Sequence, residues 1–263
     1  MSILKLTVSL LLAAMFAVGP GLAAVGSWNG IGFTAWNGVA ITSWNGTSIS
    51  TGGGGGSPAL IANVGTAGTA NGVTSGNINT TGANLLIVNA AWYSAGAADV
   101  TLTDSNSNTW TALTTQASTL VSQRLYYCYG ATVGSGHNFT LSATGSYPSI
   151  QVIALSNMSS SPLDQNTGST ASGSWTTKQP GSITPTQGNT VVVIGLCFEA
   201  NSAGAISIDG SYTISNTVAH GVGTNEGGSL AYQIFTSASA QNPTWTTASS
   251  STDGATTIAA FKY

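Results

Sequence analysis

Three copies of the tripeptide Trp-Asn-Gly stand eight residues apart near the start of the chain, beginning at Trp28, Trp36 and Trp44. Asn-Gly is the strongest short-range signal for a β-hairpin, because both residues accept the positive φ of a type I′ turn. One such unit buries too little apolar surface to offset the chain entropy that it loses, so the units must stack on one another or on another chain. The repeats therefore indicate assembly rather than chemistry.

Two structures satisfy this spacing. Each Asn-Gly either turns a hairpin between six-residue strands, or each unit forms one side of a small β-solenoid. In both cases the tryptophans share a face, because their spacing is even. The alternative is a Trp-rich extended tail that docks on the chain's own domain. We expect an assembly interface that joins copies of the chain in a homo-oligomer, either a trimer or a filament. Its residues would be Trp28, Trp36, Trp44, Ile31, Phe33, Val39, Ile41 and Ile49.

Charged residues are scarce in this chain. Its 263 residues include only 4 Lys+Arg and 7 Asp+Glu, which is 4% charged against about 25% in an ordinary globular domain. The 34 glycines and the long Ser/Thr/Asn stretches argue against a membrane protein and favour a β-rich extracellular or virion protein. A hydrophobic content of 42% is too high for a disordered chain. With a net charge of −3, the chain has no basic stripe for phosphates, so we expect no nucleic-acid partner.

Residues 1–24 have the pattern of a secretory signal peptide. Lys5 precedes an apolar run over Leu6–Val18, and small residues follow up to a cleavage site near Ala24. The run is shorter than the roughly 20 residues that a bilayer span needs, so no membrane span is expected after signal removal. We expect an extracellular or cell-surface location, or a virion if the segment is not a cleaved signal. A hydrophobic N-terminal helix retained in an assembly is the alternative.

A run of five glycines, Gly52–Gly56, separates the repeats from the rest of the chain. Such a run behaves as a flexible tether. The predicted domains are the repeat segment at 25–51, a linker at 52–58 and a β-domain at 59–263. In the last of these, apolar, β-branched and aromatic runs alternate with Gly/Asn/Ser/Asp clusters at roughly 8–12-residue intervals. The sequence predicts an all-β fold, an antiparallel jelly-roll-like β-sandwich.

The β-domain contains two similar halves, at 84–157 and 189–262. Asn84–Val88 aligns with Asn189–Val193 at an offset of 105 residues (189 − 84), and Val100–Asp104 aligns with Ala205–Asp209 at the same offset. We predict two related halves that complete one core. Two separate small sandwiches are the alternative, although each half is short for an immunoglobulin-like domain of about 100 residues.

Residues that could carry chemistry are few. His220, Asn225 and Glu226 share a Gly-rich loop, and loops on rigid sandwiches often bind ligands. We therefore treat them as candidate ligand contacts, although a solvated hairpin tip would have the same sequence. Trp175, in the connection between the halves, is a candidate exposed platform for stacking on a sugar. Because the chain has no nucleophile elbow, P-loop or His-Glu-x-x-His motif, we expect no enzyme activity, cofactor or metal.

Residues 104–108, Asp-Ser-Asn-Ser-Asn, have the alternating oxygen ligands that begin a calcium loop. Thr109 and Thr115 replace the Gly and the Glu that such a loop requires at its sixth and twelfth positions. The sequence therefore favours a β-turn.

Two cysteines, Cys128 and Cys197, lie in apolar runs with a β pattern. Export would permit a disulfide between them. Free cysteines in such runs are usually small buried hydrophobic residues. The sequence leaves both alternatives open.

The repeats at residues 28–46, the glycine tether and the Thr/Ser-rich sandwich together resemble modular proteins of tailed-phage virions and bacterial surface adhesins. The resemblance is architectural and implies no catalytic residues. It implies a non-enzymatic structural or adhesive protein displayed on a cell surface, an extracellular appendage or a virion, with surface glycans as a further partner. The alternative function is that of a secreted monomeric carbohydrate-binding module.

Overall fold

The computed structural model describes residues 56–94, 99–142, 144–199 and 206–263, together with the backbone of two-residue strands between residues 27 and 48. The chain divides into two compact units, Met1–Gly53 and Gly54–Tyr263. The described residues form strands and connecting segments without a helix, and their strand pairs are antiparallel. The prediction of an all-β antiparallel fold is therefore confirmed.

Within the first unit, short strands pair two by two on either side of each Asn-Gly dipeptide. In every pair the tryptophan lies opposite the residue three positions later in the chain. The Asn-Gly dipeptides and the side chains of the predicted assembly interface lie outside the described residues. The strands are β1 (Ser27–Trp28), β2 (Ile31–Gly32), β3 (Ala35–Trp36), β4 (Val39–Ala40), β5 (Ser43–Trp44) and β6 (Thr47–Ser48).

The second unit contains the longer strands. Runs rich in β-branched and aromatic residues form them, and Gly, Asn, Ser and Asp clusters separate them, as expected from strand and turn preferences. Their order is β7 (Ala59–Ala67), β8 (Gly72–Thr74), β9 (Leu85–Tyr93), β10 (Thr101–Asp104), β11 (Thr111–Ala112), β12 (Gln116–Ala117), β13 (Val121–Tyr129), β14 (Phe139–Ser142), β15 (Ser149–Ser156), β16 (Leu163–Lys178), β17 (Asn189–Phe198), β18 (Ile206–Ile208), β19 (Thr213–Val218), β20 (Gly227–Thr236) and β21 (Trp245–Lys262).

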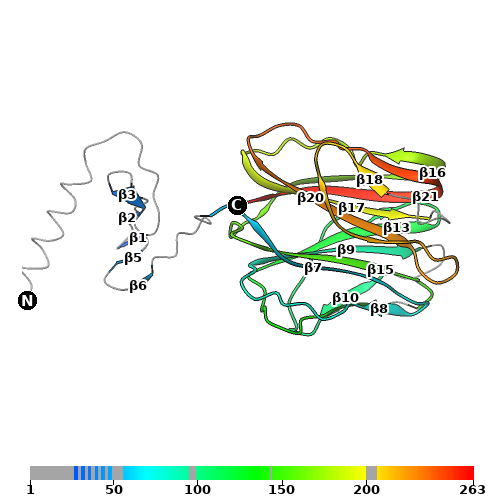
Figure 1. The fold of residues 1–263 in the computed structure, drawn as a ribbon, viewed down its shortest axis with the longest axis horizontal. Helices are drawn as coiled ribbons and strands as arrows, with labels where there is room; N and C mark the ends of the chain where they lie inside the picture. The colour runs from blue at the N-terminus through cyan, green and yellow to red at the C-terminus, as the bar shows by residue number, and fades with distance from the viewer. Residues whose placement is uncertain are drawn as a thin grey trace, which may run out of the picture. The chain divides into compact units, whose positions relative to one another are not determined.

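These strands stack in layers, which Figure 1 shows from the side. The first main sheet has the order β11-β13-β9-β15-β7, with β12 also paired to β13, and the first cover sheet has the order β10-β14-β8. The second main sheet has the order β16-β21-β17-β20-β19. A second cover layer lies at the start of β21, where Trp245 and Thr246 pair with β18 on one side and with Lys178 and Thr177 of β16 on the other.

Apolar side chains fill three spaces between these layers, rather than the single core that the sequence predicted. Strand β9 sends Leu86 toward the first cover sheet and Leu85 toward the second main sheet. Strand β17 likewise sends Val191 toward the first main sheet and Val192 toward its own cover layer. Because alternate residues of a strand point to opposite faces, a strand buried on both faces is apolar along nearly all of its length. This requirement explains the sequence of both strands.

Candidate functional site

The Gly-rich loop between β19 and β20 contains His220, Asn225 and Glu226. It is a compact turn, in which the Gly221 N–H donates to Asn225 O at 2.9 Å and the Asn225 N–H donates to Gly221 O at 3.0 Å. The Asn225 side-chain amide also donates to Ala219 O at 2.7 Å. These bonds bring the side chains of His220 and Glu226 together, so the structure groups three of the four candidate ligand contacts.

His220 and Glu226 form a buried ion pair at the base of this loop. The distance from His220 Nδ1 to Glu226 Oε2 is 3.4 Å, and each side chain is only 6% exposed. Hydrogen bonding to the Glu226 carboxylate raises the pKa of His220, although burial acts in the opposite direction. Burial raises the pKa of Glu226, and the neighbouring imidazole offsets part of that effect. The pair holds the loop in place and is screened from a substrate in solvent.

Two further carboxylates, Glu199 and Asp253, act electrostatically on Glu226. Asp253 is buried and accepts a hydrogen bond from the Leu120 N–H, while Glu199 accepts one from the Thr252 hydroxyl at 2.7 Å. Sequence reasoning assigned neither residue to a site, because they lie far apart in the chain and in no motif. In the described part of the chain, no group of three or more His, Cys, Asp or Glu residues is arranged to hold a metal ion.

Trp175 lies apart from this loop, since β16 and β19 are at opposite edges of the second main sheet. Its side chain is buried, so the exposed platform predicted from the sequence is wrong. The indole packs over Gly254, where an added methyl group would lie 2.5 Å from the ring. The missing side chain at Gly254 therefore gives the indole its space, through a contact that the local sequence around Trp175 does not indicate.

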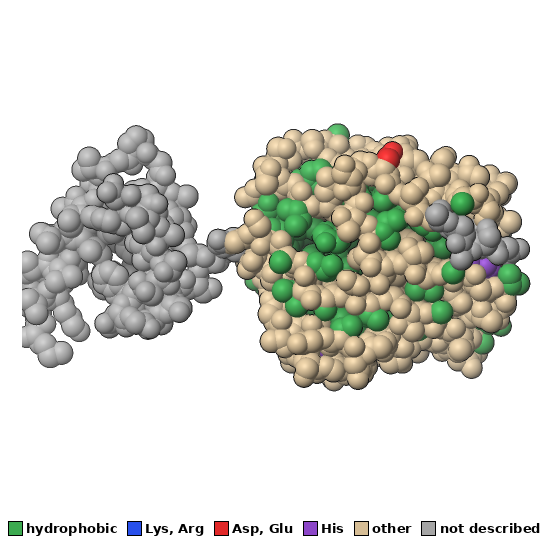
Figure 2. Space-filling view, viewed as in Figure 1, with side chains coloured by type: hydrophobic (Ala, Val, Ile, Leu, Met, Phe, Trp, Pro, Cys, Tyr) green, Lys and Arg blue, Asp and Glu red, His purple; other side chains and the backbone are tan. Residues whose placement is uncertain are grey.

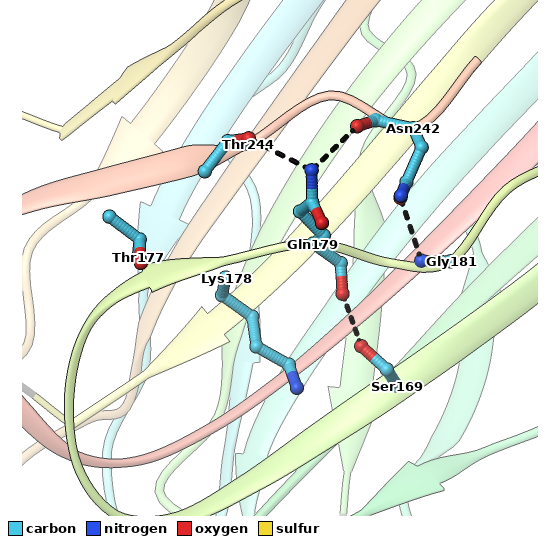
Figure 3. Close-up of a pocket in the computed structure, with 7 residues that line it drawn as sticks. All are labelled: Ser169, Thr177, Lys178, Gln179, Gly181, Asn242 and Thr244. Atoms are coloured by element: carbon cyan, nitrogen blue, oxygen red, sulfur yellow. Dashed lines mark hydrogen bonds between the residues drawn. The ribbon is translucent and has the colours of Figure 1, made fainter.

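A shallow polar hollow of about 450 Å³ opens beside β16. In Figure 3, Gln179 reaches toward Asn242 O and Thr244 Oγ1, to which its Nε2 donates at 3.1 Å each. Lys178 points the other way and donates to Thr170 O, and burial lowers the pKa of its ammonium group. Hydroxyl and amide groups without a carboxylate suit hydrogen bonding to a polar ligand rather than acid–base chemistry. The lining residues are Ser169, Thr177, Lys178, Gln179, Gly181, Asn242 and Thr244.

Asp104 and His137 form a second buried polar cluster, at the end of β10 in the first cover sheet. His137 Nε2 lies 3.1 Å from Asp104 Oδ1, and its Nδ1 lies 3.0 Å from the Thr80 hydroxyl. The order Thr–His–Asp resembles a nucleophile, a base and an orienting acid, but Thr80 and His137 are 0% exposed and so is the side chain of Asp104. The Ser107 N–H donates to Asp104 O at 3.1 Å, which confirms the β-turn predicted here.

Cys128 and Cys197 are free thiols, and both are buried. Cys128 lies on β13 in the first main sheet, and Cys197 lies on β17 in the second. Burial raises the pKa of each thiol, well above its usual range for Cys197. The disulfide alternative is therefore not realised in this structure, and both residues behave as small hydrophobic residues.

Comparison with known proteins adds no relative. No family model, curated protein or solved structure matches the chain. Among the described residues there is also no helix that is long and apolar enough to cross a membrane.

Proposed function

We propose that this chain is a non-enzymatic structural or adhesive protein, displayed on a cell surface, an extracellular appendage or a virion. The N-terminal repeats would join copies of the chain, and the layered sandwich would form the exposed surface. The support for a non-enzymatic role is that both histidines lie inside the fold. The imidazoles of His137 and His220 lie beside carboxylates inside the fold, at 3.1 Å and 3.4 Å, with side chains 0% and 6% exposed.

The outer surface supports the same proposal. In the face shown in Figure 2, backbone atoms and side chains that are neither apolar nor charged predominate, with apolar patches and few charged groups. Hydroxyl and amide groups of this kind stay solvated without the long-range repulsion that a high net charge produces. A dense array of identical copies can therefore form without strong electrostatic repulsion between neighbours.

The proposal extends to the local structure of each Trp-Asn-Gly repeat. We infer that each Trp-Asn-Gly unit is a β-hairpin rather than one side of a solenoid. The support is the pairing of Trp28 with Ile31 and of Trp36 with Val39, which leaves a two-residue connection in each case. Three hairpins in a row would present their tryptophans for stacking on other copies, since one hairpin alone is marginally stable.

We also infer that the sandwich arose from two related halves. The sheet orders β7-β15-β9-β13-β11 and β16-β21-β17-β20-β19 follow the same sequence of positions along the chain. Asn89 lies opposite Leu125 and Gln151, and Gly195 lies opposite Leu230 and Thr257. These registers support an offset of 106 residues for the central strand (195 − 89), one more than the sequence alignment suggested. This difference of one residue in the offset matters because a shift of one residue exchanges the two faces of a strand.

The native mass of the chain tests the proposed function. Residues 25–263 should form a stable oligomer, and residues 57–263 should be monomeric and folded, because the second unit is compact by itself. A monomer of residues 25–263 at high concentration would refute the assembly role.

The polar hollow favours one second candidate, a carbohydrate-binding module. The Thr177 hydroxyl and the Gln179 Oε1 acceptor, which line the hollow, could bind the hydroxyls of a sugar. A glycan array probed with residues 57–263 tests this candidate. Binding that is lost in Gln179→Ala, but kept in a matched Gln187→Ala variant outside the hollow, would support it.

A further inference from the structure

A row of amide side chains crosses the space between the two main sheets. It interrupts the apolar residues there, with four members on neighbouring strands of the first main sheet, β12, β13, β9 and β15, and a fifth on β19 at the edge of the second. Asn89 Nδ2 donates to Gln151 Oε1 at 2.6 Å, and Gln123 Nε2 donates to Asn89 Oδ1 at 2.6 Å. Thr257 Oγ1, from the opposite sheet, donates to Gln123 Oε1 at 2.5 Å. We call this row the amide belt; it consists of Gln116, Gln123, Asn89, Gln151 and Asn216.

Each member of the amide belt meets a glycine on the sheet opposite its own. A methyl group at Gly195 would overlap the side chains of Asn89 and Gln123, and one at Gly228 would lie 2.5 Å from the Gln151 amide. At one edge a methyl at Gly168 would lie 2.5 Å from Gln116, and at the other a methyl at Gly65 would lie 3.1 Å from Asn216. Each large amide thus fits a position where the facing strand has no side chain.

The two main sheets meet as the two subunits of a symmetric dimer would. Strand β9 contacts β17, which holds the corresponding place in the second sheet. The contact of β13 with β21 has its counterpart in β15 with β20, and that of β7 with β19 has its counterpart in β16 with β12. An isologous interface has this property, because residue i contacts residue j of the partner and j contacts i.

The amide belt breaks this symmetry at the centre. Asn89 and Gly195 hold equivalent places, with Asn89 opposite Gln151 and Gly195 opposite Thr257. At the centre, the first main sheet contributes the amide side chains, and the second main sheet contributes the glycines that leave room for them. The side chains of Asn89, Gln123 and Gln151 are fully buried, and a polar group without a partner in such a place is costly.

Each main sheet and its cover layer form a smaller sandwich, the first in residues 57–160 and the second in residues 161–263. We propose that the amide belt makes these two sandwiches a selective pair, so that the first sandwich pairs with the second and neither pairs with another copy of itself. In a pair of first sandwiches, Asn89 would face a second Asn89 where it now meets Gly195, and the two would overlap. In a pair of second sandwiches, glycines would face glycines or Thr257 and leave a polar cavity. A chain that assembles in many copies would thereby avoid exchanging its halves with its neighbours. The inference stands without the proposed function.

Cleavage between the sandwiches tests this pairing. A protease site placed between Ser160 and Ser161, which are exposed between β15 and β16, gives a nicked protein with all its residues present. The fragments should stay together as a one-to-one complex. After unfolding in urea and refolding, native mass spectrometry should show the mixed pair in at least tenfold excess over either pair of identical fragments. Asn89→Gly in the first fragment should lower this excess at least threefold.

Pairing of the fragments at random, in a ratio near 1:2:1, or two fragments that separate after cleavage, would overturn the proposal.

A second measurement on the intact chain keeps the test decisive if the fragments fail to refold. Gly195→Ala and Gly228→Ala should each lower the urea midpoint of residues 57–263, while Gly134→Ala, whose added methyl would meet nothing within 4 Å, should not. Equal midpoints for Gly195→Ala and Gly134→Ala would also overturn the proposal.

Discussion

Replacing Asp104 by Ala should be among the most destabilising single changes in the sandwich. Its carboxylate accepts hydrogen bonds from Trp110 Nε1 at 2.7 Å, from the Asn106 N–H at 2.8 Å and from the Asn108 side-chain amide at 3.1 Å. His137 Nε2 lies 3.1 Å from the same carboxylate, and the Asp104 side chain is 0% exposed. The change therefore removes the acceptor from several donors at once.

The magnitude follows from the donors left without a partner. A buried donor without an acceptor costs about 1–3 kcal/mol, and partial relaxation makes the sum for Asp104→Ala about 3–5 kcal/mol. Asp104→Asn keeps one acceptor oxygen but turns an N–H₂ group toward either Trp110 or the other donors, so it should cost about 2 kcal/mol on the same scale. Urea unfolding of residues 57–263 measures both values.

A loss below about 1 kcal/mol for Asp104→Ala would refute the argument, since it would match an ordinary surface substitution. Calcium provides a control, because the structure assigns the carboxylate to protein donors. Adding calcium or a chelator should leave the urea midpoint unchanged, and a midpoint raised by calcium would show that the turn is a cation site after all.

Two further predictions concern groups inside the fold. The pKa values of His220 and Glu226 are both raised, so the stability that they contribute is present at low pH and is lost as the pH rises through those raised values, from above about 4.5 for the carboxyl and 6.5 for the imidazole. Residues 57–263 should thus become less stable toward alkaline pH, and His220→Gln should remove the part of this dependence that lies above pH 6.5, where the imidazole titrates; the same slope above that pH in the variant would contradict it. Cys128 and Cys197 should react slowly with a thiol reagent in the folded protein and fully in urea, whereas fast labelling of Cys197 in the native state would contradict its burial.

Much of the strand pattern could be predicted from the sequence, because local patterning determines it. The apolar run at Leu86–Ala91 lies in β9, and the Asp-Ser-Asn turn at Asp104 forms as expected. The number of apolar layers could not be read in the same way. An apolar run shows that a strand is buried on both faces, but not whether one core or two covers those faces.

The packing of Trp175 and the amide belt were missed for a different reason. The place of the Trp175 indole depends on Gly254, and the place of Asn89 depends on Gly195, each a contact between distant parts of the chain. One signal for the belt was present in the sequence. Asn89 is a single amide inside an otherwise apolar strand, and a polar residue in such a position must find partners within the fold.

The mass of the chain from Val25 to Tyr263, measured by sedimentation equilibrium over a range of concentrations, tests whether the repeats drive assembly. We predict an oligomer that becomes a folded monomer when Trp28, Trp36 and Trp44 are changed to Ser. A matched variant with Ser27, Ser43 and Ser48 changed to Ala should keep the oligomer. An oligomer that survives loss of the three tryptophans, or a parent chain that is monomeric at every concentration, would contradict the claim that the repeats drive assembly.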